Sequence, residues 1–219
     1  MEKTLKHLQS VDIELLDDYV KLCYEAMRSC KESNSYNHSE NDKDMIFERD
    51  FIISLAYAMG RLEAKRDTAN YLIGGEINKY VFDHYLRCES EKEELISKTQ
   101  KQLDFKTDYV TPDFLIHKYK KIEEIKENGG QKLVIEAKTK RTLSDNDFYC
   151  DFFKLNVYLI RLNFEYAVYI MINQSVDSID TMLDNYINKG FYVNNEGKKR
   201  LIFLIQDNEE EYPQSFQFK

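Results

Sequence analysis

The sequence is poor in the residues that interrupt regular structure. Its 219 residues include only 2 prolines and 7 glycines, and tryptophan is absent. This scarcity argues against a loop-rich all-β fold, because such a fold needs turn residues at short intervals. Hydrophobic residues make up 42% of the chain and charged residues 32%, which excludes wholesale disorder. We therefore expect one domain of long regular elements, or one domain with an elaboration.

Cysteine patterns typical of metal sites and long apolar runs are also missing. The four cysteines form no C-x-x-C pair and no zinc-type spacing: Cys23, Cys30, Cys88 and Cys150. We expect reduced thiols, with Cys23 and Cys30 as packing residues of one helix. The first residues contain no apolar signal segment, and no apolar run has the length of a membrane span. The expected protein is cytoplasmic and has no membrane contact.

Positive charge is scarce and is concentrated in one block. The net charge of −8 argues against a protein that coats nucleic acid through charge alone. Residues 1–97 carry 13 Lys/Arg against 20 Asp/Glu (−7), residues 98–141 carry 11 against 7 (+4), and residues 142–219 carry 7 against 12 (−5). The positive block has the charge expected near a phosphate-bearing substrate. The alternative is a solvated lysine-rich hairpin at residues 118–126.

Apolar spacing predicts helices over much of the chain. Helical periodicity covers residues 3–31 and 43–66, with a polar linker at 33–39 between them. Further helices are expected at residues 89–103, 148–162 and 176–188. Strands are expected at residues 109–117, 132–139, 166–172 and 200–206, followed by a solvated acidic tail at 207–211. Gly74-Gly75 is interpreted as a turn, and residues 76–82 fit either a strand, which we prefer, or the start of another helix. The run 166–172 lacks a polar face and is therefore expected at the centre of a sheet.

This order of elements predicts an α/β fold, with a mixed β-sheet core flanked by helices. Strands 109–117 and 132–139 are expected to pair as antiparallel neighbours through a long polar connection. Residues 1–42 are interpreted as an N-terminal helical extension and residues 43–219 as the main domain.

Two of these strands carry the charged residues of greatest interest. Asp113 follows Pro112 in the first strand, and Glu136 and Lys138 project from one face of the second. The alternate residues of the second strand are apolar, as a buried layer requires: Leu133, Ile135 and Ala137. Mg²⁺ prefers oxygen ligands and commonly takes one or two carboxylates together with substrate phosphate. The pattern predicts a Mg²⁺ site, with Mn²⁺ as a substitute.

Each residue of this predicted site has an expected role. Asp113 and Glu136 hold the ion, and the backbone carbonyl of Ala137 adds a third protein ligand. Such an ion binds a phosphodiester oxygen and activates a water molecule. Lys138 positions the water or neutralises developing charge, or it acts as a base through a lowered pKa. The competing interpretation is a β-hairpin with a surface Glu/Lys pair that contributes a few tenths of a kcal/mol.

The segment Pro112-Asp113, followed by Glu136-Ala137-Lys138, resembles the core motif of the PD-(D/E)xK nuclease superfamily, which includes type II restriction endonucleases. The resemblance runs from about Glu48 to about Ile172. Glu48 is similar to the acidic residue on the first core helix of that family. The segment 151–155, Asp-Phe-Phe-Lys-Leu, lies where many members carry an Asp…Lys-Leu turn.

The resemblance implies a restriction-endonuclease-like fold and a Mg²⁺-dependent phosphodiesterase that cleaves DNA, as an endonuclease or exonuclease, leaving a 5′-phosphate. Defence against foreign DNA is one biological setting that it suggests. The implied catalytic residues are Asp113, Glu136, Lys138 and Glu48.

Several assignments stay open at the level of sequence. Glu63 and Glu76 compete with Glu48 for the place of the third acid. Lys154 and Gln131 are candidates for substrate contact, and each has an ordinary surface role as its alternative. His117 shares a strand face with Asp113, but a lone histidine at a strand end is more often structural.

The function also has alternatives. One is a non-catalytic or regulated module on the same fold, which binds a protein partner or nucleic acid through the N-terminal helices. Another is cleavage of RNA, because the metal chemistry does not select the sugar. A homodimer would place two sites against the two strands of a duplex.

Overall fold

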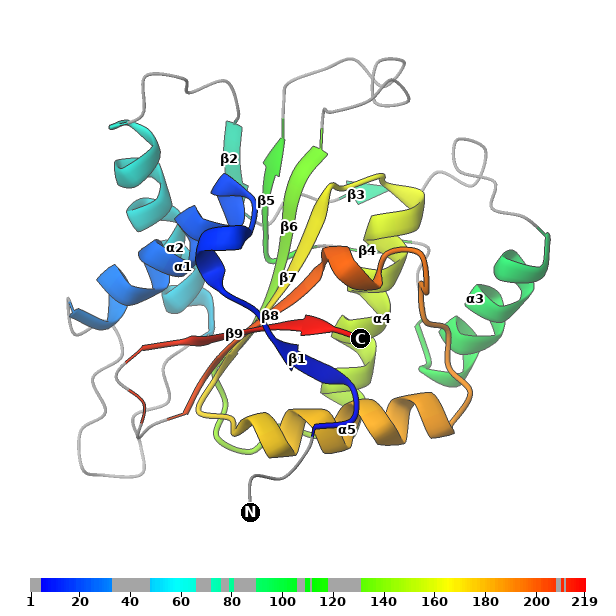
Figure 1. Ribbon diagram of the computed structural model, residues 1–219. Coiled ribbons are helices and arrows are strands. Elements are labelled where there is room, and N and C mark those ends of the chain that lie inside the picture. Colours follow the sequence, from blue (N-terminus) through cyan, green and yellow to red (C-terminus); the bar gives the residue numbers. More distant parts are fainter. Residues whose placement is uncertain are drawn as a thin grey trace.

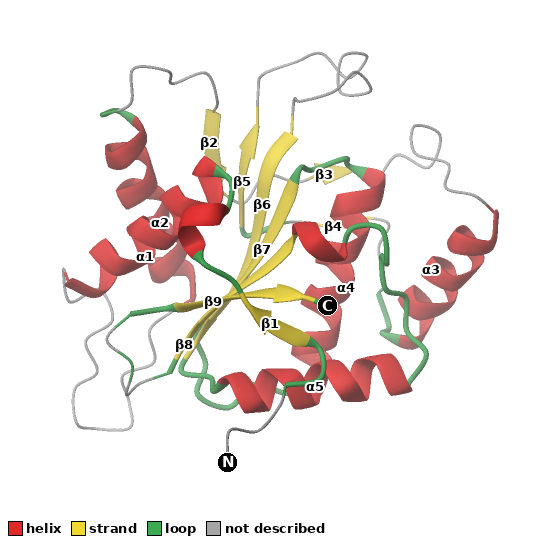
Figure 2. Cartoon of the chain, in the orientation of Figure 1, coloured by secondary structure: helices red, strands yellow, loops and turns green. Residues whose placement is uncertain are grey.

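The computed structural model describes residues 5–32, 48–65, 72–75, 79–80, 90–105, 109–110, 112–117, 131–207, 210 and 212–219. Within these ranges five helices flank a seven-stranded mixed sheet (Figures 1 and 2). The helices are α1 (Asp18–Glu32), α2 (Glu48–Glu63), α3 (Ser90–Gln102), α4 (Asp145–Arg161) and α5 (Val176–Asn188). The predicted α/β class is confirmed.

The main sheet has the strand order β1-β9-β8-β7-β6-β5-β2. These strands are β1 (Leu8–Ser10), β2 (Leu72–Gly75), β5 (Phe114–His117), β6 (Gln131–Lys138), β7 (Tyr166–Ile172), β8 (Leu201–Gln206) and β9 (Gln214–Phe218). The three central strands β6, β7 and β8 run parallel, and the outer strands pair antiparallel. Short strands β3 (Lys79–Tyr80) and β4 (Tyr109–Val110) form a separate pair.

The helices cover the two faces of the sheet in separate groups. Helices α1 and α2 pack on one face, where they meet the apolar residues Leu133, Ile135 and Ala137 of β6 (Figure 1). Helices α4 and α5 pack on the other face, since each connects two parallel neighbours, β6 to β7 and β7 to β8. Both faces of the central strands are therefore buried, which explains their nearly continuous apolar sequences.

The alternation predicted for β6 is confirmed. The three apolar residues named above lie in the core beneath α1 and α2, whereas Val134 lies in the core beneath α4. Glu136, two residues beyond Val134, therefore faces α4. The predicted antiparallel pairing of β5 with β6 is also confirmed, with Phe114 opposite Ile135. Cys23 and Cys30 are buried packing residues of α1, as expected.

The prediction of one helix over residues 3–31 is wrong in its first half. Leu8–Ser10 form the edge strand β1, a short 3-10 turn follows at Ile13–Leu15, and the helix begins only at Asp18. Strand β1 pairs with β9 at the opposite end of the chain. Local periodicity could not reveal this strand, because the hydrogen bonds that define it come from residues more than 200 positions away.

The region after residue 200 also differs from prediction. A second strand, β9, follows β8 and pairs with it, although the sequence indicated only an acidic tail there. Gly74-Gly75, interpreted as a turn, belongs to β2. The single strand expected at 109–117 is divided between β4 and β5, which lie in different sheets.

Other predicted segments fall beyond the described residues. These are the linker 33–39, most of the connection 118–131, and Cys88 and Glu76. No helix of the described part is long and apolar enough to cross a membrane.

Candidate active site

The candidate site lies where β5 begins and β6 ends. Phe114 pairs with Ile135 in the antiparallel ladder, so one further step of this register sets Asp113 opposite Glu136. The backbone N–H of Ala137 donates a hydrogen bond to Asp113 Oδ2 at 2.8 Å, which fixes the carboxylate against β6. Asp113 and Ala137, which are 24 positions apart in the sequence, are thereby brought together by the sheet.

Glu136 is completely buried and has two side-chain partners. Lys154 Nζ lies 2.8 Å from Glu136 Oε2, and the Tyr158 hydroxyl donates to Oε1 at 3.1 Å. Lys154 and Tyr158 are four residues apart on α4, so consecutive turns of that helix present both groups to one carboxylate. The helix begins at a Ser144 cap, whose hydroxyl accepts from the Asp147 backbone N–H.

Lys138 connects the strand to α2. Its ammonium Nζ lies 3.0 Å from Glu48 Oε1 and 2.9 Å from Asp151 Oδ2. Glu48 is the first residue of α2, which brings the start of that helix to the end of β6. The predicted association of Glu48 with the strand residues is therefore present as an ion pair with Lys138. The Glu48 side chain is 31% exposed, so the cluster reaches solvent there.

Asp151 joins the two lysines. Its Oδ1 lies 2.7 Å from Lys154 Nζ while its Oδ2 binds Lys138, and its side chain is only 7% exposed. The Tyr169 hydroxyl of β7 donates to Oδ2 at a longer 3.5 Å. The result is a chain of alternating charges, Glu48–Lys138–Asp151–Lys154–Glu136, which we call the ion-pair network.

Sequence reasoning did not assign site roles to Asp151 and Tyr158. In the sequence, Asp151 belongs only to the segment 151–155 that resembles a family turn. The useful signal was the spacing of Asp151, Lys154 and Tyr158, which are three and four residues apart and so share one face of α4. This spacing becomes informative only once α4 is known to pack on the face of β6 that carries Glu136.

Burial raises the pKa of three carboxyl groups in this site, those of Glu48, Asp113 and Glu136. For Glu48 and Asp113 the loss of hydration is partly offset, by Lys138 in one case and by the Ala137 N–H in the other. Burial raises the pKa of Glu136 most, despite the neighbouring Lys154 ammonium, and Asp151 and Asp113 add to the rise. Four carboxyl groups share two ammonium groups here, so their mutual repulsion is incompletely neutralised.

The two lysines are shifted in the direction that keeps them charged. Burial lowers the pKa of Lys138, but Asp151 and Glu48 raise it by more, so it lies above its ordinary value. Lys154 behaves in the same way beside Glu136 and Asp151. A base needs a lowered lysine pKa, and the carboxylates around Lys138 shift its pKa in the opposite direction. The contacts to Glu48 and Asp151 favour the charged form of Lys138.

The donor atoms of the site suit a hard divalent cation, because they are carboxylate oxygens. However, among the described residues no three His, Cys, Asp or Glu side chains converge as a ready metal site. The reason is visible in the contacts, since lysine ammonium groups lie between the carboxylates of the network. The carboxylate oxygens of Asp113 and Glu136 are suitable ligands for such an ion, but Glu136 Oε2 already contacts the Lys154 ammonium.

Other predicted residues lie away from this cluster. Gln131 begins β6, five residues from Glu136, and is therefore about 17 Å from the site along the strand. His117 pairs with Gln131 at that same far end. Glu63 ends α2, about 22 Å from Glu48 along the helix, and accepts a hydrogen bond from Tyr19. Neither Gln131 nor Glu63 takes part in the site, and Glu76 lies outside the described residues.

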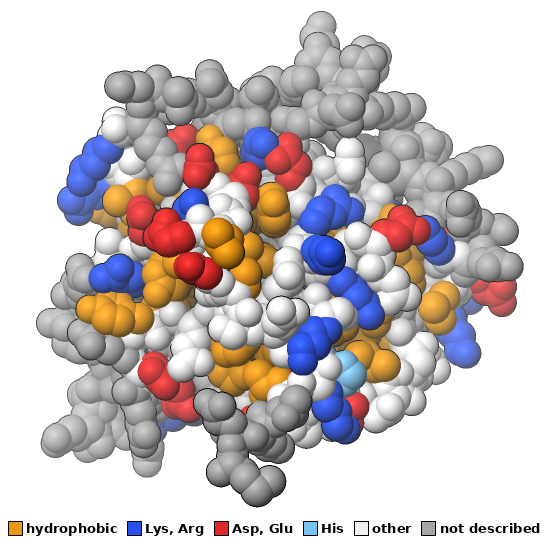
Figure 3. Space-filling view, viewed as in Figure 1, with side chains coloured by type: hydrophobic (Ala, Val, Ile, Leu, Met, Phe, Trp, Pro, Cys, Tyr) orange, Lys and Arg blue, Asp and Glu red, His pale blue; other side chains and the backbone are white. Residues whose placement is uncertain are grey.

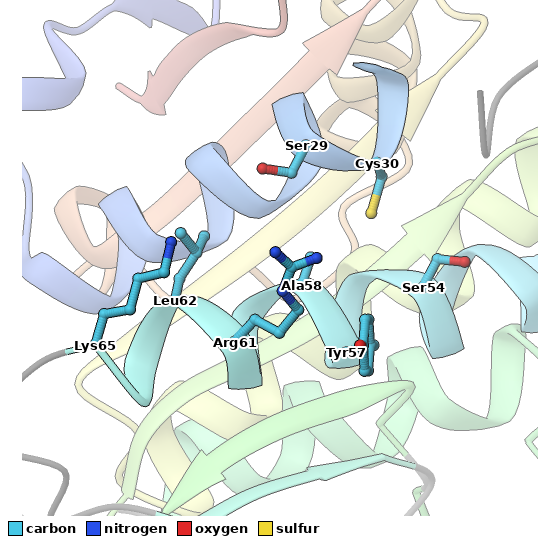
Figure 4. Close-up of a pocket in the computed structure, with 8 residues that line it drawn as sticks. All are labelled: Ser29, Cys30, Ser54, Tyr57, Ala58, Arg61, Leu62 and Lys65. Atoms are coloured by element: carbon cyan, nitrogen blue, oxygen red, sulfur yellow. The ribbon is translucent and has the colours of Figure 1, made fainter. Parts of the chain in front are cut away.

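A hollow of about 250 Å³ lies between α1 and α2, separate from the ion-pair network (Figure 4). Ser29 and Cys30 of α1 face Tyr57 and Arg61 of α2 across it. Burial raises the pKa of the Cys30 thiol to about 11, so this group is protonated and unreactive at neutral pH. The Cys30 thiol is therefore treated as a packing group of this hollow.

Basic side chains also gather on one face of the molecule, over β9 and the short 3-10 turn Lys198–Arg200 (Figure 3). Lys198 Nζ lies 5.1 Å from the centroid of the Phe218 ring in β9. Much of the positive block 98–141 lies outside the described residues. Positive surface charge is thus also present beyond the block that the sequence indicated.

No family model, curated protein or solved structure matches this chain.

Proposed function

We propose that this protein is a Mg²⁺-dependent nuclease that cleaves DNA, with Mn²⁺ as a substitute ion. The observation that carries the proposal is the placement of Asp113 against the end of β6, where Glu136 and Lys138 share one face. Perturbed carboxyl groups beside fixed cations are concentrated at functional sites, because burying charge without a function is costly.

The order of elements supports the same proposal. Helix α2 is followed by the antiparallel strands β2, β5 and β6, with β3, α3 and β4 inserted between β2 and β5, and then by α4 and the parallel strand β7. This order is the one expected of a restriction-endonuclease-like core, with the Glu-x-Lys segment at the end of its third strand. The additional strands β8, β9 and β1 extend the sheet on the opposite side.

Each side chain has a chemical role in the proposed reaction. Asp113, Glu136 and the Ala137 carbonyl would hold the ion. The bound ion supplies Lewis-acid stabilisation of the phosphodiester and acidifies a water molecule. Lys138, held from two sides by Glu48 and Asp151, places a permanent positive charge where the phosphate accumulates negative charge. Holding Lys138 in advance avoids reorganisation during the reaction.

Cleavage assays with matched variants test the proposal. Purified protein is incubated with plasmid and linear DNA in Mg²⁺ or Mn²⁺, and products are followed on gels. We expect Asp113→Ala and Lys138→Ala to reduce cleavage by about a hundredfold or more. Lys140→Ala is the control, because Lys140 lies just beyond β6, its side chain is 53% exposed, and its ammonium lies 4.0 Å from Asp147. It should retain wild-type cleavage.

Three results would contradict the proposal. They are an inactive wild type in both metals, equal cleavage by the two site variants, and equal loss of cleavage in the Lys140 control. A parallel assay with single-stranded and duplex RNA distinguishes RNA from DNA as the substrate. Cleavage of RNA alone would identify RNA, not DNA, as the substrate of the same site.

One observation favours the second candidate function, a non-catalytic module that binds a partner through α1 and α2. Tyr57 and Ile53 of α2 are 69% and 58% exposed, and Tyr57 borders the hollow between the two helices (Figure 4). Exposed aromatic groups beside a concave surface are common at interfaces. Calorimetric titration with Mg²⁺, in the absence and presence of DNA, discriminates the two functions, since the module needs no ion at Asp113.

A further inference from the structure

The Lys154 ammonium occupies the contact that a divalent cation would need at Glu136. It lies 2.8 Å from Glu136 Oε2, and the other oxygen of that carboxylate accepts from the Tyr158 hydroxyl. The Glu136 side chain has no exposed surface. A cation that binds Glu136 therefore has to displace Lys154 or share one oxygen with it.

The network also provides a place for a displaced ammonium. Lys154 is bound simultaneously to Asp151 Oδ1 at 2.7 Å, on the same helix and three residues away. Asp151 in turn keeps Lys138 through its other oxygen. Loss of the Glu136 contact thus leaves both lysines paired, which lowers the cost of opening this single ion pair.

We propose that Lys154 is an intramolecular competitor of the divalent cation at Glu136, so that metal binding requires the Lys154–Glu136 ion pair to open. This inference rests on the proposed function, because it concerns the same ion. It makes Lys154 a positioning residue that regulates occupancy of the site. The earlier hypothesis of a direct substrate contact by Lys154 is a separate one.

The competition has a quantitative consequence. When only a fraction of molecules has the open ion pair, the apparent affinity for the cation is reduced by that fraction. A hydrogen bond to a charged group is strong enough to lower that fraction to about one tenth to one hundredth. Removal of the ammonium should therefore tighten cation binding about ten- to a hundredfold.

Calorimetric titration with MnCl₂ tests the inference without relying on cleavage. Lys154→Met keeps the aliphatic stem and removes the charge, and it should bind Mn²⁺ about ten- to a hundredfold more tightly than wild type. Lys154→Arg keeps a cation and should bind no more tightly than wild type. Lys132→Met is the matched control, because Lys132 lies on β6, the strand that carries Glu136, and its ammonium has a partly buried carboxylate partner of its own, Glu165, at 2.5 Å. It should leave Mn²⁺ affinity unchanged.

A second variant and a second measurement complete the test. Adding Glu136→Gln to Lys154→Met should abolish the gained affinity, because it removes the carboxylate for which ammonium and cation compete. If Lys154→Met does not fold, the ¹⁵N signal of the wild-type Lys154 Nζ is followed instead during Mg²⁺ saturation, with Lys132 as the internal reference. The Lys154 signal should shift and the Lys132 signal should not.

The inference is overturned if Lys154→Met binds Mn²⁺ no more tightly than wild type, if Lys154→Arg binds it more tightly, or if no variant binds it. An unchanged Lys154 signal at Mg²⁺ saturation overturns it as well. Cleavage measured in parallel separates this inference from the proposed function. If Lys154→Met binds Mn²⁺ more tightly but the protein cleaves no nucleic acid, the competition is supported and the proposed nuclease function is contradicted. If the protein cleaves DNA but wild type and Lys154→Met bind Mn²⁺ equally, the nuclease function is supported and the competition is contradicted.

Discussion

Asp151 binds two largely enclosed ammonium groups, and its replacement measures how much the ion-pair network stabilises the fold. Its carboxylate oxygens lie 2.9 Å from Lys138 Nζ and 2.7 Å from Lys154 Nζ. We predict that Asp151→Asn, which conserves volume and removes the charge, lowers the free energy of unfolding by about 2 kcal/mol at neutral pH.

The magnitude follows from opposing terms. Two hydrogen bonds between charged groups would together contribute roughly 3–6 kcal/mol. The loss is smaller here because Lys138 keeps Glu48 and Lys154 keeps Glu136, so neither ammonium becomes unpaired. The asparagine carbonyl also still accepts one bond. In addition, removal of one carboxylate relieves repulsion on the neighbouring acids, Glu136 among them.

Urea unfolding and thermal denaturation provide the assay. A loss of about 2 kcal/mol corresponds to a fall in Tm of about 4–8 °C for a domain of this size. Asp147→Asn is the control on the same helix, because Asp147 is 47% exposed and lies 4.0 Å from Lys140. It should change stability by less than about 0.5 kcal/mol.

Equal effects of Asp151→Asn and Asp147→Asn would refute this reasoning, as would a gain in stability from Asp151→Asn. A double-mutant cycle that combines Asp151→Asn with Lys154→Met sharpens the test. Directly paired groups should show a coupling energy of about 1 kcal/mol or more.

Three further predictions concern other contacts. Asp180→Asn should lower the free energy of unfolding by about 2 kcal/mol and increase amide hydrogen exchange in β1. The reason is that the Asp180 carboxylate accepts hydrogen bonds from backbone N–H groups at the start of that strand, including that of Leu8. Unchanged hydrogen exchange in β1 would contradict this prediction. Tyr158→Phe should lower the free energy of unfolding by about 1–2 kcal/mol, and by more than Tyr19→Phe does, because the Tyr158 hydroxyl donates a hydrogen bond to the fully buried Glu136 carboxylate. Equal losses of stability in urea unfolding would argue against this. Burial raises the pKa of Glu136 above 4.5, so the folded protein binds a proton at this carboxyl group more tightly than the unfolded chain does. The stability that this proton contributes is therefore present in full below about pH 4.5 and is lost as the pH rises through the raised pKa. Glu136→Gln should flatten this part of the stability profile, and an unaltered profile would exclude the assignment.

Elements with strong local signals could be predicted from the sequence. The apolar run Tyr166–Ile172 and the amphipathic helix Val176–Asn188 occur at their expected residues. The N-terminal strand β1 and the last strand β9 could not be predicted in this way. They stabilise each other across the whole chain, and neither shows a periodicity that separates a strand from a helix or a tail.

The candidate site was predicted in part for a similar reason. Asp113, Glu136 and Lys138 stand out because charged residues interrupt otherwise apolar strands. Gln131 lies away from the site because five residues of extended strand separate it from Glu136. The role of Lys154 depends on α4 packing over β6, which brings its ammonium to a buried carboxylate 18 residues earlier.

Three features can be read from the sequence alone: the α/β class, the antiparallel pairing of β5 with β6, and the faces of β6 on which charged and apolar residues lie. These follow from local periodicity, since side chains alternate along a strand and recur every three to four residues along a helix. The pairing of the charges, in contrast, depends on how the elements pack in three dimensions. The network Glu48–Lys138–Asp151–Lys154–Glu136 draws on two helices and one strand. The energy of a charge pair depends on distance and burial, which packing sets, so no local pattern could predict that lysines would stand between the carboxylates.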